Sequence, residues 1–197
     1  MALTLYGASR SRASIVRWYL EEKEIPYTWE LLDLAAGENK REPFTRINPF
    51  GKVPALVDSS ILLADDQPLA LFESGAILLH VAEVHAQEWS SPAARALTNQ
   101  WVLWANATFG PALVAAAQRP EELNRQLAVL DGLLGRGGPL VSGTPGGWGA
   151  ADCAVQAYLA YLPLFCPAHD LSAYGQVQAS IAATQARPAY RRVMGLA

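Results

Sequence analysis

The stretch Asn48-Pro49-Phe50-Gly51-Lys52-Val53-Pro54-Ala55-Leu56 decides the fold of this chain. It leads into the apolar run 53–57, whose composition predicts a short buried strand. Pro54 removes a hydrogen-bond donor from that strand, and a proline in a strand is costly unless the position serves a purpose. We therefore expect a third strand here, in which Pro54 either has a special role or is an ordinary edge-strand proline.

The sequence on both sides of this stretch alternates short apolar runs with helical patterns. Before it, the runs 3–6 and 27–34 predict two strands, and the apolar spacing within 11–24 predicts a helix between them. Such a βαβ unit has parallel strands and a right-handed crossover. Residues 43–47 predict a short helix, 69–72 a fourth strand and 73–84 a further helix. The order β-α-β followed by β-β-α predicts a thioredoxin-like α/β fold.

The composition changes near residue 90, where alanine- and leucine-rich helical patterns begin. We expect helices over 92–117, 123–134, 151–162 and 172–186, the last stopped by Pro188. Residues 135–149 contain seven glycines and two prolines, which predicts a loop. The chain is thus expected to hold an α/β domain at 1–84, a linker at 85–91 and an all-helical bundle at 92–197.

Charge and composition exclude several classes of protein. The net charge is −3 with no basic stripe, which argues against an electrostatic grip on nucleic acid or on an acidic membrane. The N-terminus lacks the apolar core of a secretory signal, and no run of 18 apolar residues predicts a membrane span. Cys153 and Cys166 are too few for a disulfide framework, so we expect a cytoplasmic protein with reduced thiols. His80, His85 and His169 lack the spacing of a zinc site, and we predict no metal.

Several motifs together resemble one family. The segment 48–56, followed by Glu73-Ser74-Gly75-Ala76-Ile77, resembles the glutathione-binding signature of the glutathione transferase superfamily. Leu5-Tyr6-Gly7, Ser11-Arg12-Ala13-Ser14 and Ala151-Asp152 are similar to that family too. The motifs follow in the right order over nearly the whole chain. The segment 9–14 lacks a clear class residue and in this resembles the bacterial and cyanobacterial, chi-like transferases.

The resemblance implies how glutathione, as co-substrate, would be held. Val53, before a cis Pro54, would pair its backbone with the cysteinyl part of the tripeptide. Glu73 and Ser74, at the start of a helix, would hold the γ-glutamyl ammonium and carboxylate, because a helix N-terminus favours an anion. Simple helix capping is the alternative role for this pair. Lys40 and Lys52 fall where the family places cations for the glycyl carboxylate.

Conjugation also needs the glutathione thiol as a thiolate. Its free pKa is about 8.5, so the protein must stabilise the anion. A hydroxyl at the start of the first helix serves this purpose in the family, and the candidates are Tyr6, Ser9, Ser11 and Ser14. We favour Ser11 as the catalytic hydroxyl with Arg10 as a cationic helper, and place Ser9 among the glutathione-binding residues.

The second substrate is expected to be a small apolar electrophile that contacts the helical domain. The candidate contacts are Trp104, Thr108, Phe109 and Tyr161. An aromatic stripe at helical spacing is also what a helix core looks like, so both roles stay open.

Two departures from the family pattern are visible. Asp152 fits the third position of a capping box, but Gly149 stands where the family usually has Ser or Thr, so half of that cap is missing. The connection 59–68 is longer than the family's tight turn, and we expect an extended loop there.

The resemblance implies an enzyme that conjugates glutathione to electrophiles such as isothiocyanates or aryl halides, and a homodimer. The alternative is a non-catalytic, transferase-like interaction protein. The first helix carries no cysteine near its start, which argues against the cysteine-dependent classes and against the glutathione-dependent isomerases.

Overall fold

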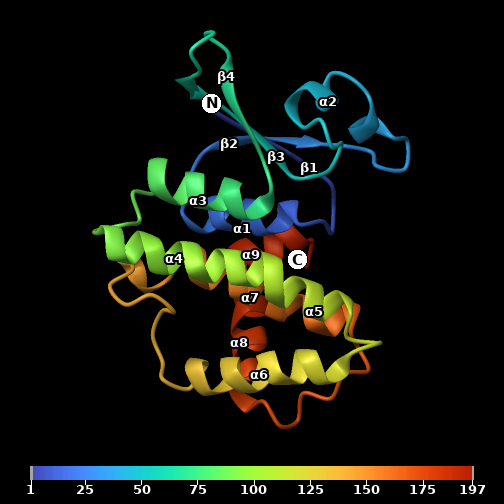
Figure 1. Ribbon diagram of the computed structural model, residues 1–197, viewed down its shortest axis with the longest axis vertical. Coiled ribbons are helices and arrows are strands. Elements are labelled where there is room, and N and C mark those ends of the chain that lie inside the picture. The colour runs from blue at the N-terminus through green and yellow to red at the C-terminus, as the bar shows by residue number, and fades with distance from the viewer. Residues whose placement is uncertain (1, 197) are drawn as a thin grey trace. The chain divides into compact units, whose positions relative to one another are not determined.

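The computed structural model describes residues 2–196 and divides them into two compact units. The first unit runs up to Ala86 and includes the segment from Arg191 onward, and the second is Gln87–Tyr190. Figure 1 shows the sheet in the first unit and only helices and loops in the second.

The first unit is built on a four-stranded sheet with the order β2-β1-β3-β4. The strands are β1 (Leu3–Gly7), β2 (Tyr27–Leu31), β3 (Ala55–Leu62) and β4 (Pro68–Phe72). β1 runs parallel to β2, whereas β3 is antiparallel to both β1 and β4. The thioredoxin-like arrangement predicted from the order of the elements is therefore confirmed.

Helices cover both faces of this sheet. α1 (Ala13–Glu22) and α3 (Ser74–Val84) pack against each other on one face, and the short α2 (Phe44–Ile47) lies on the other (Figure 1). A single turn of 3₁₀ helix, η1, spans Glu38–Lys40. Apolar side chains on the inner faces of β1, α1 and α3 are fully buried, among them Leu5, Ile15 and Leu78. This core fixes the starts of α1 and α3 beside the loop that precedes β3.

The connection 59–68 differs from the loop that we expected. β3 continues to Leu62 and β4 begins at Pro68, with a register irregularity between Asp58 and Leu62. The outer half of this hairpin is mostly exposed. A strand is recognised in a sequence by alternating apolar and polar residues, and the consecutive serines Ser59 and Ser60 interrupt any such alternation. The outer parts of the strands of this exposed hairpin lack the alternation of apolar and polar residues, so the sequence did not predict them.

The second unit is helical. Its elements are α4 (Pro92–Trp104), a π-helical turn η2 (Ala105–Phe109), α5 (Gly110–Val114), α6 (Pro120–Leu134), a 3₁₀ turn η3 (Pro145–Gly147), α7 (Ala150–Phe165) and α8 (Gly175–Ala186), while α9 (Pro188–Met194) runs into the first unit. α7 lies at the centre, packed against α4 and α8, and most of its residues up to Leu162 are buried. Among residues 2–196, no helix combines the length and the apolarity that a bilayer crossing requires.

Two helix predictions are corrected. The helix expected over 92–117 is interrupted by the π turn and ends at Val114. Pro188 does not simply stop the preceding helix, because it also begins α9. Proline lacks the N–H that a first helical turn leaves unpaired in any case, so it suits that position.

Candidate functional site

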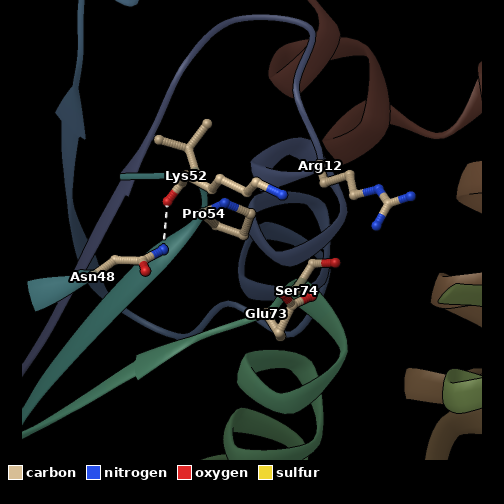
Figure 2. Close-up of a pocket in the computed structure, with 7 residues that line it drawn as sticks. Arg12, Asn48, Lys52, Pro54, Glu73 and Ser74 are labelled. Atoms are coloured by element: carbon tan, nitrogen blue, oxygen red, sulfur yellow. Dashed lines mark hydrogen bonds between the residues drawn. The ribbon is translucent and has the colours of Figure 1, made fainter. Parts of the chain in front are cut away.

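A pocket opens in the first unit where three chain segments meet. Its volume is about 310 Å³. The lining residues come from the start of α1, the loop between α2 and β3, and the junction of β4 with α3 (Figure 2): Arg12, Asn48, Lys52, Val53, Pro54, Glu73 and Ser74. Five of the predicted glutathione-binding residues thus share one pocket, together with two residues that were not predicted, Arg12 and Asn48.

The loop between α2 and β3 is held in shape by two asparagines. The Asn48 side chain donates to the Lys52 carbonyl at 2.7 Å and accepts the Phe50 N–H at 3.1 Å (Figure 2). The buried Asn39 side chain donates to the Gly51 carbonyl at 2.6 Å. Gly51 has a φ of +58°, and a Cβ there would lie 2.6 Å from the Asn39 carbonyl oxygen, so only glycine fits. The pocket wall formed by this loop is therefore rigid.

The Val53–Pro54 peptide bond is cis, as expected from the resemblance. Val53 precedes the first residue of β3 by two positions and lines the pocket. Within residues 2–196, the Val53 backbone takes part in no hydrogen bond. Its N–H and C=O are thus available to an extended peptide that lies in the pocket, in the manner of strand addition.

Glu73 and Ser74 form the opposite wall at the N-terminus of α3. Glu73 has φ 71° and ψ 118°, a conformation that costs about 1–3 kcal/mol for a residue with a side chain. Ser74 is only 2% exposed and is the first residue of an eleven-residue helix. The N–H groups of a first helical turn and the positive end of the helix dipole favour an anion at this position. The carboxylate of Glu73 next to them favours a cation, so the wall is suited to an α-amino acid group.

Two cationic side chains line the pocket, and a third lies close to the loop that forms one of its walls. Arg12 and Lys52 line it, and in Figure 2 the Lys52 side chain points toward Arg12. The Lys40 ammonium is not part of the lining, but it lies 3.3 Å from the place that a Cβ on Gly51 would take, next to Lys52 in the chain. A ligand with more carboxylates than ammonium groups matches this distribution of charge.

The predicted thiolate activators lie outside the pocket lining. The Ser11 hydroxyl donates to the Ala8 carbonyl at 2.7 Å and accepts the Ala13 N–H at 3.2 Å. Arg10 has a φ of 54°, and neither it nor Ser9 is among the lining residues. The cation that reaches the pocket from this segment is Arg12.

Sequence reasoning missed Arg12 because the position of the first helical turn decides which side chain of 9–14 faces the pocket. The regular helix begins at Ala13, two residues later than predicted, with Arg12 immediately before it. Two candidates remain. Ser14 is buried in α1, with 8% of its surface exposed, and Tyr6 lies against Phe44 with ring centroids 5.9 Å apart. Burial, with a smaller contribution from Glu30, raises the pKa of Tyr6, which makes its hydroxyl a weaker acid.

The predicted electrophile contacts lie around the π turn and α7. Phe109 is fully buried and stacks on Trp104 with centroids 5.2 Å apart, which is the environment of a core residue. Tyr161 is 7% exposed and packs edge-on against Tyr158 and Phe165. Thr108 is exposed on the π turn. Such turns occur often at functional sites.

Comparison with known proteins finds a family that the first unit resembles. Residues 1–83 match the family described as the glutathione S-transferase N-terminal domain. This match covers the sheet, α1, α2 and nearly all of α3, and so includes every residue that lines the pocket.

Relatives extend the likeness beyond residue 83. The disulfide-bond oxidoreductase YfcG of Escherichia coli is 42% identical over 113 residues, which are 56% of this chain and 52% of YfcG. The glutathione S-transferase GstB of the same species is 36% identical over 135 residues, 64% of this chain and 62% of GstB. These alignments span little more than half the length of either relative.

A solved structure matches almost the whole chain. The crystal structure of a glutathione transferase family member from Pseudomonas fluorescens, with two glutathione bound, superposes with a TM-score of 0.84. It is 28% identical, and the match covers 98% of this chain and 92% of that one. The thioredoxin-like unit followed by a helical unit is therefore a known arrangement.

Proposed function

We propose that the chain is a glutathione transferase, which conjugates the glutathione thiolate to small hydrophobic electrophiles. Residues 1–83 match the glutathione S-transferase N-terminal domain family, which supports this proposal. The observation that carries this proposal is the pocket itself. It combines an unpaired Val53 backbone, a helix N-terminus at Glu73-Ser74 and two lining cations within about 310 Å³. The solved relative from Pseudomonas fluorescens, with two glutathione bound, supports the choice of ligand.

Glutathione is proposed to span the pocket from wall to wall. Its γ-glutamyl carboxylate would meet the N–H groups and hydroxyl at Ser74, and its ammonium would meet the Glu73 carboxylate. The cysteinyl N–H and C=O would pair with the Val53 backbone. The glycyl carboxylate would then face Lys52, with Lys40 as a further cation beside it. In this arrangement the ammonium of the tripeptide faces a carboxylate, one of its carboxylates faces the start of α3 and the other faces a lysine.

Thiolate stabilisation is proposed to come from the start of α1. Arg12 lines the pocket and carries a permanent positive charge, so it lowers the pKa of a thiol held near it. Ser11 remains the proposed hydroxyl donor, although it must give up its bond to the Ala8 carbonyl to donate to a thiolate. Arg12 thus replaces Arg10 as the proposed cationic helper.

The electrophile is proposed to contact the helical unit through Trp104, Thr108 and Tyr161, with Phe109 supporting Trp104 from below the surface. The proposed substrates are isothiocyanates and aryl halides, as in the chi-like class that the segment 9–14 resembles. A cytoplasmic homodimer is part of the same proposal. The alternative is a protein that binds glutathione without catalysis, and the activity assays described below distinguish it from an enzyme.

Glutathione-dependent disulfide reduction is a second candidate, because YfcG is named a disulfide-bond oxidoreductase. In that reaction one glutathione thiolate attacks a disulfide RS–SR, which forms a mixed disulfide and releases RS⁻. A second glutathione thiolate attacks the mixed disulfide, which gives glutathione disulfide and the second RS⁻. The two released thiolates take up the two protons that the glutathione thiols lost. No protein cysteine is needed, so the lack of one near α1 does not exclude this reaction.

Parallel assays of the purified full chain test these proposals. Glutathione affinity is measured first, followed by conjugation to an aryl halide and to an isothiocyanate and by reduction of a small disulfide. Wild type, Ser11→Ala, Arg12→Ala and Arg10→Ala are compared. Conjugation that falls in Ser11→Ala and Arg12→Ala but not in Arg10→Ala supports the transferase. Disulfide reduction without conjugation would favour the second candidate. Binding with neither activity would leave the non-catalytic alternative, and no binding would overturn all three.

A further inference from the structure

Asp58, His80 and His85 form a cluster that shares no residue with the pocket. The Nε2 atoms of His80 and His85 lie 2.8 Å and 2.7 Å from the same oxygen, Oδ2 of Asp58. One ligand-type atom from each of the three side chains falls within 4.8 Å of the other two. Asp58 is completely buried, whereas the histidine side chains are 13% and 18% exposed, so the cluster is open to solvent on its histidine side.

The fold brings these residues together from distant positions in the sequence. Asp58 lies on β3, His80 on α3, and His85 is the residue that follows the last residue of α3. The N–H groups of both His85 and Ala86 donate to the Val81 carbonyl, so the chain leaves the regular helix at this point. The two imidazole rings consequently stand 5.8 Å apart although a regular helix would place residues five apart on different sides.

The Asp58 carboxylate is held in a fixed orientation by its second oxygen. Oδ1 accepts the Ser60 N–H at 3.0 Å and the Ser60 hydroxyl at 2.5 Å. Burial alone would raise the pKa of Asp58, but the hydrogen bonds from Ser60, His85 and His80 hold it well below its usual value. The carboxylate is therefore ionised at neutral pH. Hydrogen bonds to the oxygen that does not face the cluster are the usual support of a metal-binding carboxylate.

We propose that Asp58, His80 and His85 bind a divalent transition-metal ion, with Zn²⁺ as the best match, in a site separate from the glutathione pocket. Two imidazoles and one carboxylate are a donor set that zinc takes up with a water molecule or another small ligand at the fourth position. Hard cations such as Mg²⁺ prefer oxygen ligands alone and are a poor match.

Metal binding requires the side chains to adjust. Tetrahedral zinc with bonds of about 2.0–2.1 Å keeps its ligand atoms roughly 3.3 Å apart. Each histidine Nε2 therefore moves away from Asp58 Oδ2 by about half an ångström, and the ligand atoms, now within 4.8 Å of one another, rearrange around the ion through torsions of the partly exposed histidine side chains. Each Nε2 now donates its proton to Asp58, so metal binding requires that a neutral imidazole carry its proton on Nδ1 instead and give the Nε2 lone pair to the ion. The competing state is the present hydrogen-bonded trio with no affinity for metal.

Zinc uptake by the untagged full chain tests the proposal. Protein treated with a chelator is dialysed against Zn²⁺, and bound metal is measured by mass spectrometry for wild type, His80→Gln, His85→Gln and His169→Gln. His169 lies in the helical unit and bonds to Asn124, so it is the matched control. We expect a single Zn²⁺ per chain in wild type and in His169→Gln, and affinity at least about tenfold weaker in the other two variants.

Wild-type protein provides a second measurement that does not depend on how the variants fold. Co²⁺ replaces Zn²⁺, and its visible absorption reports four-coordinate geometry. Intense bands that Zn²⁺ displaces support the site. Absence of zinc uptake in wild type, or equal uptake in wild type and in both folded cluster variants, would overturn it and leave the hydrogen-bonded trio as the whole role of the cluster.

Discussion

The Glu88 carboxylate accepts the backbone N–H of Ala150 with both oxygens, each at 3.0 Å, at the first turn of α7. Glu88 is only 4% exposed and lies 62 residues before its partner in the chain. Gly149, the N-cap residue, has no side chain with which to satisfy these N–H groups. Glu88 therefore accepts, from another segment, a first-turn N–H of α7 at the helix end where Gly149 offers no side chain.

The other half of the cap is formed by Asp152, as the sequence predicted. Its Oδ2 accepts the Gly149 N–H at 3.0 Å, and its Oδ1 accepts the Leu140 N–H at 2.9 Å. A Cβ on Gly149 would overlap the Glu88 carboxylate and lie 2.6 Å from the Thr144 methyl carbon. Gly149 and Glu88 therefore depend on each other. A side chain on residue 149 would occupy the space of the Glu88 carboxylate, and the Glu88 carboxylate leaves no room for such a side chain.

We predict that Glu88 and Gly149 are energetically coupled. Glu88→Ala removes the cap and lowers the free energy of unfolding by about 1–3 kcal/mol. Gly149→Ser is also destabilising in wild type because its Cβ displaces Glu88. In the Glu88→Ala background the same serine gains room and its hydroxyl can cap α7, so the double variant is more stable than the sum of the two losses by about 1 kcal/mol or more.

Urea unfolding of the four proteins in this cycle measures the coupling energy. Gly132→Ser is the control, because a Cβ at that helical glycine meets no atom within 4 Å. It should show no coupling to Glu88→Ala. Simple additivity of Glu88→Ala and Gly149→Ser would contradict the idea that Glu88 substitutes for the missing side chain.

The order of elements was predictable from sequence because local patterns determine it. The apolar runs of β1 and β4 and the spacing within α1 and α3 appear in the sequence at nearly their observed bounds. The outer part of the β3–β4 hairpin was not predictable, because its exposed residues carry no alternation. The beginning of α9 was missed for a different reason, since Pro188 serves both as the end of one helix and as the start of the next.

The parts of the candidate site that consist of neighbouring residues in the sequence were predictable. Val53-Pro54 and Glu73-Ser74 share the pocket because each is a local feature at the end of a strand or the start of a helix. Arg12 was missed because its direction depends on the residue at which α1 begins. Asp58 with His80 and His85, and Glu88 with Ala150, depend on contacts between segments 22 to 62 residues apart, which no local pattern encodes.

We predict that Ser74→Ala weakens glutathione binding without changing the fold. The variant removes a hydroxyl from the anion-binding wall, which costs roughly 1–2 kcal/mol and raises the dissociation constant about tenfold. Isothermal titration with glutathione measures the change, and circular dichroism checks the fold. Ser172→Ala, at an exposed position in the other unit, should bind like wild type. Unchanged affinity in folded Ser74→Ala would contradict the proposed orientation of the tripeptide.

We predict that Arg12, and not Arg10, lowers the pKa of the bound thiol. Arg12 lines the pocket and Arg10 does not. Arg12→Gln should raise the thiol pKa of bound glutathione by about one unit, which corresponds to about 1.4 kcal/mol, while Arg10→Gln leaves it unchanged. The ultraviolet absorbance of the thiolate, followed against pH in the binary complex, measures this pKa. A larger effect in Arg10→Gln than in Arg12→Gln would return the helper role to Arg10.

Tyr190 is predicted to make unfolding depend on alkaline pH. It is 3% exposed, and burial raises its pKa to about 12, against about 10 in an unfolded chain. Its contribution to stability is fully present below about pH 10 and is lost as the pH rises toward 12, because the unfolded state releases the proton first. The loss amounts to roughly 2–3 kcal/mol.

Urea unfolding from about pH 9 to 12 should therefore show the stability of wild type falling toward that of Tyr190→Phe by this amount. Tyr174→Phe, at a less buried tyrosine, should follow the wild-type profile. A constant difference between wild type and Tyr190→Phe across the range would show that Tyr190 ionises equally in both states.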